Sequence, residues 1–277
     1  MPSALPGLLL AGRISVETAQ RLKIASDVAG REHTGADSQL AARTIFVGDV
    51  HGCAAELQDL LNAVGLTSSD RVVLVGDLVA RGPDTRGVLR LVRELKASTV
   101  RGNHEERMIA AHAARKGGAS GPRLGSSHTE LLQVLDDEDW AQLEALPLHL
   151  DLPEHGIRVV HAGVVPGVAW EAQDPWMVTH IRSIAADGSP TEKWGRSWAE
   201  VYRDTPHIVF GHNAQSLPQL HPNATGIDTA CVYGGNLTAL VLPADTAPPP
   251  VLDRPAVLVC VPARQRYKDY GRTLPGH

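Results

Sequence analysis

The chain has 277 residues, of which 43% are apolar and 21% are charged, and its formal net charge is −5 near neutral pH. This length allows one large α/β domain or two small ones, and one large domain is our expectation. No apolar run reaches the ~18 residues of a membrane span, and residues 7–10 lack the basic flank of a secretory signal, so we expect a cytoplasmic protein with no membrane partner. The net negative charge disfavours an obligate nucleic-acid partner. It allows a small anionic substrate, because local arginines and metal ions set the field in a cleft.

Residues 1–42 carry no strong strand signal, and we interpret them as an N-terminal extension with one helix near 15–28. A single domain is then predicted over residues 43–277. It begins with an apolar, β-rich strand at 43–48. Apolar residues then recur at helical spacing over 57–64, which predicts a helix directly after the strand.

This strand–helix unit repeats twice. Residues 72–76 form a second predicted strand, and Asp84 is the predicted N-cap of the helix that follows it. Residues 98–102 form a third strand, which leads into a helix at 104–114. Alternating strands and helices predict parallel strands joined by right-handed crossovers.

The rest of the chain predicts shorter elements. Residues 115–130 are rich in Gly and Ser and are interpreted as a mobile loop, followed by a helix at 130–145. Short strands are then expected at 156–160, 207–210, 224–227, 236–242 and 255–261. Turn residues rather than long helices separate them, so this half is predicted to complete a second sheet in a mixed α/β (α+β) fold.

Polar side chains able to bind a metal directly follow five of the predicted strands. They are Asp49 and His51, Asp77, Asn103, His161, and His212. In open α/β sheets, ligands bind beyond the carboxyl ends of the strands, so these distant side chains are predicted to converge. Taken singly, each could be a turn former or a hydrogen-bonded histidine. Their joint occurrence at matching strand ends favours metal binding.

The mixture of carboxylate, imidazole and amide donors suits divalent ions of intermediate hardness. Manganese is our first expectation for the metal, with iron, cobalt or zinc as alternatives. Six donors are too many for one structural ion. They suit two ions ~3.5–4 Å apart with one carboxylate between them, the arrangement that assists phosphoryl transfer.

Three motifs resemble those of the metallophosphoesterases of the phosphoprotein-phosphatase superfamily. They are Gly-Asp-x-His-Gly at 48–52, Gly-Asp-x-Val-x-Arg-Gly at 76–82 and Gly-Asn-His-Glu at 102–105, and the later His-Ala-Gly at 161–163 and Gly-His at 211–212 match as well. The resemblance covers about residues 43–242. It implies a four-layer α-β-β-α metallophosphatase sandwich whose βαβ units carry the ligands.

The resemblance also implies a division of roles among the site residues. One metal would be held by Asp49, His51 and Asp77, and the second by Asp77, Asn103, His161 and His212. It further implies that His104 donates a proton to the leaving group and that Arg81 binds phosphate.

One position separates the chain from the protein phosphatases. They carry Asp before the motif arginine, where it supports the acid histidine, whereas this chain has Ala80. Ala80 and the stretches at 226–239 and 266–269 resemble the symmetrical bis(5′-nucleosyl)-tetraphosphatases. The short region between the last two metal-ligand motifs and the Glu at position 105 depart from the long form of that family, which makes the substrate less well defined than the metals.

The resemblance implies attack of metal-bound hydroxide on a dinucleoside polyphosphate, such as diadenosine tetraphosphate, to give two ADP. Without a carboxylate at Ala80 the pKa of the catalytic imidazole should fall, which suits a good leaving group such as a nucleoside diphosphate. The alternatives are a Ser/Thr protein phosphatase acting on a phosphoprotein and an enzyme that removes RNA caps. A non-catalytic phosphate or metal sensor is the alternative outside enzymes. We expect a monomer.

Three further residues are candidates for substrate binding. Arg182 resembles a second phosphate-binding arginine but could lie on a solvated face. Asp228 could orient a metal-binding histidine or cap a turn. Tyr233 could stack on a base or pack in the core. His128 shows no spacing that predicts a role.

Overall fold

The first sheet begins with the predicted strand–helix repeat. The computed structural model describes residues 42–271, so the helix expected near 15–28 lies outside the described residues. Strand β1 (Arg43–Val47) leads to α2 (Ala54–Ala63), β2 (Arg71–Leu74) to α3 (Thr85–Glu94), and β3 (Ser98–Thr99) to α4 (Asn103–Gly117). The three strands are parallel, as the alternation predicts, and the side chain of Asp84 caps α3.

Two C-terminal strands complete this sheet, in the order β13-β12-β1-β2-β3. β12 (Asn236–Pro243) pairs antiparallel with β1, and β13 (Leu258–Pro262) pairs antiparallel with β12. The prediction that these strands join the second sheet is therefore wrong, because β12 covers the free edge of β1. β13 also begins later than predicted, since Pro255 lies in a short 3-10 turn at Arg254–Val257.

The second sheet has the order β10-β11-β9-β5-β4. Its central strands β5 (Ile157–Val160), β9 (His207–Phe210) and β11 (Ala224–Gly226) are parallel and were predicted. The edge strands β4 (His149–Leu152) and β10 (Gln219–His221) were not expected. They are short and carry polar residues, so their sequence signal is weak.

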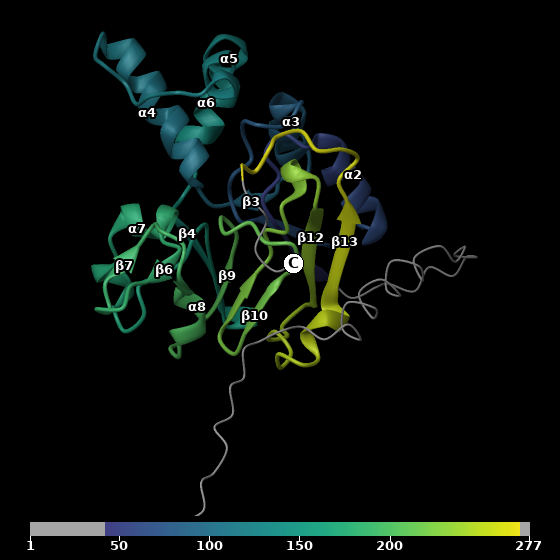
Figure 1. Ribbon diagram of the computed structural model, residues 1–277. Coiled ribbons are helices and arrows are strands. Elements are labelled where there is room, and N and C mark those ends of the chain that lie inside the picture. The colour runs from purple at the N-terminus through teal and green to yellow at the C-terminus, as the bar shows by residue number, and fades with distance from the viewer. Residues whose placement is uncertain (1–41, 272–277) are drawn as a thin grey trace, which may run out of the picture.

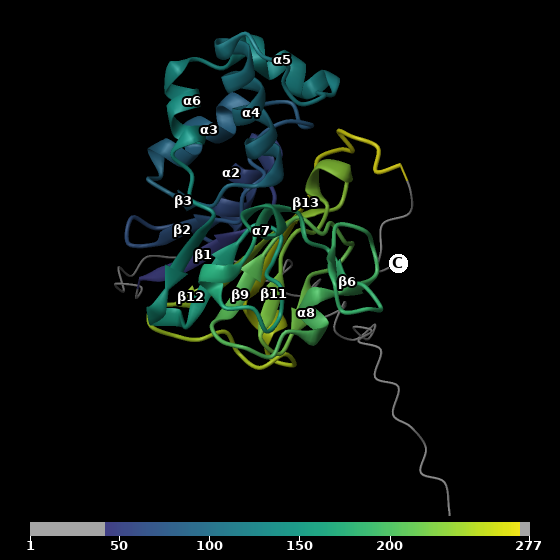
Figure 2. The ribbon, with the colours of Figure 1, turned by 90° about the vertical axis from the view of Figure 1, so that its left-hand side faces the viewer.

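Side-chain alternation along the strands produces the layers. Ile45 and Val47 of β1 pack with α2 and α3, whereas Phe46 between them faces a core shared with the second sheet. The second sheet does the same: Val209 faces the shared core, and Phe210 packs with Trp198 on the outer side. Three cores therefore separate four layers, which confirms the α-β-β-α sandwich (Figure 2).

The outer helices of the second sheet are α7 (Pro175–His180) and α8 (Trp198–Val201). Beside them lies a small sheet of β6 (Ser183–Ile184), β7 (Pro190–Thr191) and β8 (Arg196–Ser197), which was not predicted. No helix within residues 42–271 is long and apolar enough to cross a membrane.

A helical unit of α4, α5 and α6 projects beyond the sheets (Figure 1). The single helix expected at 130–145 is two helices, α5 (Ser126–Val134) and α6 (Asp137–Glu144), because Asp136 caps a new helix start. The predicted loop is correspondingly shorter: α4 continues to Gly117, and only residues 118–125 lack regular structure.

Candidate metal centre

Side chains from five strand ends meet at one edge of the two sheets. Asp49 and His51 follow β1, Asp77 follows β2, Asn103 begins α4, His161 follows β5 and His212 follows β9. Asn103 is half-buried, and the other five have exposed fractions between 0% and 8%. The predicted convergence of six potential ligands is therefore what the structure shows.

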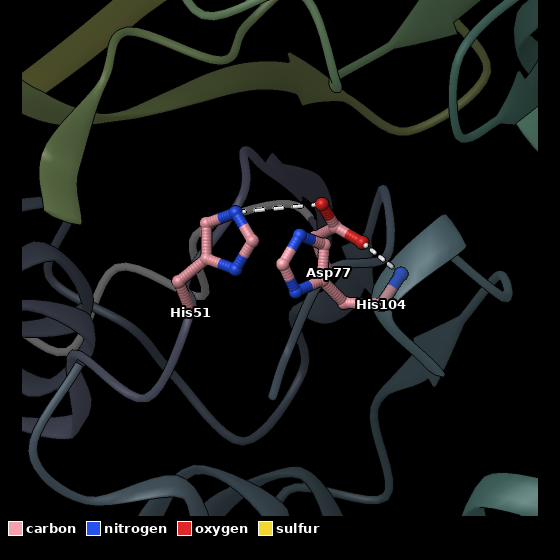
Figure 3. Close-up of side chains that lie close together, drawn as sticks. All are labelled: His51, Asp77 and His104. Atoms are coloured by element: carbon pink, nitrogen blue, oxygen red, sulfur yellow. Dashed lines mark hydrogen bonds and ion pairs between the residues drawn. The ribbon is translucent and has the colours of Figure 1, made fainter. Parts of the chain in front are cut away.

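One group of potential ligands consists of His51, Asp77 and His104, whose donor atoms lie within 4.8 Å of one another (Figure 3). Nε2 of His51 lies 3.4 Å from Oδ2 of Asp77, and the backbone N–H of His104 donates to Oδ1 of Asp77 at 3.0 Å. Asp49, from the predicted first ligand set, lies alongside, where its carboxylate accepts the backbone N–H of His212 at 3.0 Å.

A second group consists of Asp77, His161 and His212. Nε2 of His161 lies 3.4 Å from Oδ1 of Asp77. Oδ1 of Asn103 lies 3.1 Å from Nε2 of His161 and 3.0 Å from Nδ1 of His212. Since Asp77 belongs to both groups, with one oxygen toward His51 and the other toward His161, it has the geometry of a bridging carboxylate.

Backbone carbonyls hold two of the histidine rings. Nδ1 of His51 lies 3.1 Å from the carbonyl oxygen of Val79, and Nδ1 of His161 lies 2.9 Å from that of Val75. A carbonyl can only accept, so each Nδ1 donates its hydrogen, and in the neutral ring Nε2 then keeps a lone pair directed into the site. This is the tautomer that a metal-binding histidine needs.

The backbone is strained where the site residues emerge from their strands. His51, Asp77, Arg81 and His212 have φ angles of 47°, 48°, 71° and 63°, in the left-handed region that side chains disfavour. Such a conformation costs of order 1–3 kcal/mol at each position and persists only when the surrounding structure enforces it. The strain therefore concentrates at the cluster.

Two glycines allow the motif turns to approach the carboxylates. A Cβ added at Gly102 would collide with the carboxylate of Asp77, and one at Gly211 would collide with that of Asp49. Close approach of the backbone to these two carboxylates therefore requires glycine at both positions.

The carboxylate of Glu105 ties the second motif to the third. It is fully buried and accepts backbone N–H groups from Asp77 at 2.9 Å, Leu78 at 2.8 Å, Val79 at 3.1 Å and Gly102 at 2.8 Å. The sequence predicted no structural role for this glutamate, which counted only as the last residue of the third motif and as a departure from the long-form tetraphosphatases. Its position in the first turn of α4 was the signal that it accepts backbone N–H groups.

The electrostatics of the site fit divalent cations. The carboxyls of Asp49, Asp77, Glu105 and Asp228 are all buried. The pKa of Asp49 is raised well above its ordinary value by burial and by repulsion from Asp228 and Asp77. Cations would relieve this repulsion.

His104, the predicted proton donor, faces the site beside His51, with the two ring centroids 4.7 Å apart. Its pKa is held well below the ordinary value, chiefly by burial and further by nearby Arg81, against the opposing effect of Asp77. The direction agrees with the expectation from Ala80, although burial is the main cause. Nε2 of His128, for which no role was predicted, lies 3.0 Å from Nδ1 of His104.

Arg81 and Tyr233 lie together at the edge of the cluster. NH1 of Arg81 is 2.6 Å from Nε2 of His51, so the guanidinium reaches the metal-ligand positions. The central carbon of the guanidinium lies 5.4 Å from the ring centroid of Tyr233, which in turn packs edge-on against Tyr270. Tyr233 is thus placed to support Arg81.

Arg182 and Asp228 also lie next to ligand-bearing turns. NH1 of Arg182 donates to the carbonyl oxygen of His212 at 3.2 Å and to the side chain of Asn213 at 2.9 Å. Asp228 accepts the backbone N–H of Ala230 at 3.0 Å, as a turn cap does, and raises the pKa of the Asp49 carboxyl.

Two facing sheets with this histidine, aspartate and asparagine cluster at their shared edge define a metallophosphoesterase. Phosphoesterases of this class use divalent metal ions, and the two ligand groups could hold them. More specifically, the chain belongs to the calcineurin-like phosphoesterase family, whose model matches residues 42–242.

Among curated proteins, the chain is similar to bacterial proteins named symmetrical bis(5′-nucleosyl)-tetraphosphatase. The one from Shewanella sp. (strain ANA-3) is 45% identical over 258 residues, covering 70% of this chain and 92% of the relative. The one from Shewanella baltica (strain OS185) is 45% identical over 189 residues, covering 66% of this chain, which spans only 61% of that relative. Among solved structures, a candidate diadenosine tetraphosphatase is 34% identical with a TM-score of 0.68, covering 81% of this chain and 95% of that structure.

Proposed function

We propose that the protein is a two-metal hydrolase that cleaves phosphoanhydride bonds of dinucleoside polyphosphates, converting diadenosine tetraphosphate to two ADP. The observation that carries the proposal is the cluster around Asp77, whose two oxygens face two separate groups of potential ligands. The choice of substrate is supported by Ala80 and by the names of the similar tetraphosphatases.

Asp49, His51 and Asp77 would hold one ion, and Asp77 with Asn103, His161 and His212 the other. Two divalent ions bound there would activate a water for attack on phosphorus and offset the charge of the phosphates. We propose manganese as the native metal.

The residues around the ions would bind the substrate and assist the leaving group. The guanidinium of Arg81 binds phosphate oxygens at the edge of the cluster, and Tyr233 steadies it from the other side. Arg182 provides a second cation beside His212, and Asp228 fixes the turn next to Asp49. His104 presents a ring N–H to the oxygen of the departing nucleoside diphosphate.

Ala80 favours a leaving group that is stable as an anion. Burial already lowers the pKa of His104, and no carboxylate at position 80 restores it. A serine alkoxide must be protonated as it leaves, whereas a nucleoside diphosphate is a stable anion. We therefore rank the dinucleotide above a phosphoprotein and above an RNA cap.

Product analysis separates the alternatives. The full chain would be incubated with Mn²⁺ and diadenosine tetraphosphate, and in parallel with a phosphopeptide, and the products separated by chromatography. ADP alone supports symmetrical cleavage, and AMP with ATP contradicts it. Faster turnover of the phosphopeptide would overturn the substrate. Inactivity on both, with an Asp77→Asn variant as the matched blank, would support a sensor.

Three broader features belong to the same proposal. Residues 43–277 would act as one metallophosphoesterase domain, supported by β13, which lies beyond the family match and still belongs to the first sheet. The protein would act in the cytoplasm as a monomer.

A further inference from the structure

We propose that His128 is a positioning residue that orients His104 through a hydrogen bond between two imidazole rings. Nε2 of His128 lies 3.0 Å from Nδ1 of His104, which is an ordinary hydrogen-bond length for two ring nitrogens. The inference rests on the proposed function, since it assigns to His128 a task in that reaction.

The two rings lie close together at a small angle. Their centroids are 4.8 Å apart and their planes differ by only 26°. His104 is 5% exposed and His128 is 6% exposed, so little water competes for the bond. The ring of His104 is thereby fixed at Nδ1 beside His51 and Asp77, and its Nε2 remains available to a substrate.

Helix α5 places His128 in this position. It lies in the first turn of α5, in the helical unit that projects beyond the sheets (Figure 1). Oγ1 of Thr129 donates to the carbonyl oxygen of Gly125 at 3.1 Å, and NH1 of Arg115 on α4 donates to the carbonyl oxygen of Leu132 at 3.1 Å. The start of α5 and its packing on α4 are therefore both held.

The direction of the bond follows from what His104 must do. A ring N–H directed at the leaving group requires a hydrogen on Nε2 of His104, so in the neutral ring Nδ1 is the acceptor and Nε2 of His128 donates. The bond then selects the useful tautomer. His128 suits this task because an imidazole can donate from Nε2, which a carboxylate cannot do.

A partner that donates to Nδ1 has a chemical consequence. A carboxylate beside Nδ1 would stabilise a doubly protonated His104 that can transfer a proton outright, as a poor leaving group requires. His128 instead supports only hydrogen-bond donation from Nε2, and no proton needs to change atoms. That is sufficient for a nucleoside diphosphate, which departs as a stable anion. His128 therefore favours dinucleotide substrates over alkyl phosphomonoesters.

Three substitutions at His128 test the role, with diadenosine tetraphosphate and a phosphoserine peptide as substrates. His128→Ala removes the donor and is expected to lower kcat on the dinucleotide by about 10–100-fold with KM within about 3-fold. His128→Gln keeps an amide N–H and is expected to recover most of the loss. His128→Asp accepts from Nδ1 and is expected to raise peptide turnover relative to dinucleotide turnover at least about 10-fold.

The matched control is Glu130→Ala, an exposed position on the same helix, which should leave both activities unchanged. Thermal unfolding identifies variants that do not fold, and if His128→Ala is one, the Gln and Asp variants decide. Unchanged kcat in His128→Ala, or equal activity of the Ala and Gln variants, overturns the inference. An unchanged ratio of peptide turnover to dinucleotide turnover in His128→Asp also overturns the inference. Wild-type protein that leaves the dinucleotide intact overturns the proposed function instead, and the three variants are then compared on the peptide alone.

Discussion

Replacing Glu105 with Gln should destabilise the fold and weaken metal binding together. The carboxylate accepts four backbone N–H groups, two at each oxygen: Asp77 and Gly102 at one, Leu78 and Val79 at the other. An amide keeps only one oxygen, so two buried N–H groups would face an NH₂ that cannot accept. Each unsatisfied group costs about 1–3 kcal/mol, which gives a loss of about 2–6 kcal/mol in the free energy of unfolding.

Metal binding should weaken because the loop that carries Asp77 loses its anchor. Loss of such a supporting contact typically costs about 10–100-fold in metal affinity. Urea unfolding of the metal-free protein would give the first quantity, and calorimetric titration with Mn²⁺ the second. Glu130→Gln, exposed on α5, is the control for the substitution itself. If Glu105→Gln matches the wild type in both measurements, the four hydrogen bonds do not hold the motif in place.

Further predictions concern the turns, the pH, the metal and the substrate. Gly211→Ala should displace Asp49 and lower Mn²⁺ affinity at least about 10-fold by calorimetry, whereas Gly117→Ala, where an added Cβ meets nothing within 4 Å, should not. Burial, and then Arg254, lowers the pKa of His207 to about 3. The unfolded chain therefore takes up a proton that the folded chain does not, and stability should fall as the pH drops below ~6.5, by about 2–3 kcal/mol at pH 4.5. In urea unfolding His207→Asn should reduce that slope, and an unchanged slope would contradict the assignment. A chelator should abolish hydrolysis and lower the melting temperature, both reversed by Mn²⁺, and retention of activity in chelator would exclude a metal mechanism. Ala80→Asp should increase phosphopeptide turnover relative to dinucleotide turnover. An unchanged ratio would contradict the proposal that Ala80 favours a leaving group that is stable as an anion.

The fold could be predicted where the local pattern determines it. The three strand–helix units show strong periodicity, and each appears close to its predicted bounds. The sheet that a later strand joins is not a local property. β12 and β13 are apolar strands that either sheet could accept, and only the pairing of β12 with β1, nearly two hundred residues earlier, decides between them.

The convergence of the six candidate ligands could be predicted for a different reason. Each follows a strand, and parallel strands bring their carboxyl ends to one edge, so sequence order alone implies proximity. The role of Glu105 could also have been predicted, because it lies in the first turn of a predicted helix, where a carboxylate accepts backbone N–H groups. The role of His128 could not be predicted. Its contact with His104 depends on how α5 folds back on α4 across residues 118–125, and no sequence pattern indicates that turn.

Backbone strain and charge repulsion at the site link metal binding to the stability of the fold. His51, Asp77 and His212 hold disfavoured backbone conformations, and the buried carboxyl of Asp49 is repelled by its neighbours. In the metal-free chain these costs must be offset by the three apolar cores and by the hydrogen bonds to Glu105. Bound cations would reverse the electrostatic cost while leaving the backbone strain in place. Metal loss should therefore destabilise the protein without collapsing it, and the ligand turns should be the first segments to open.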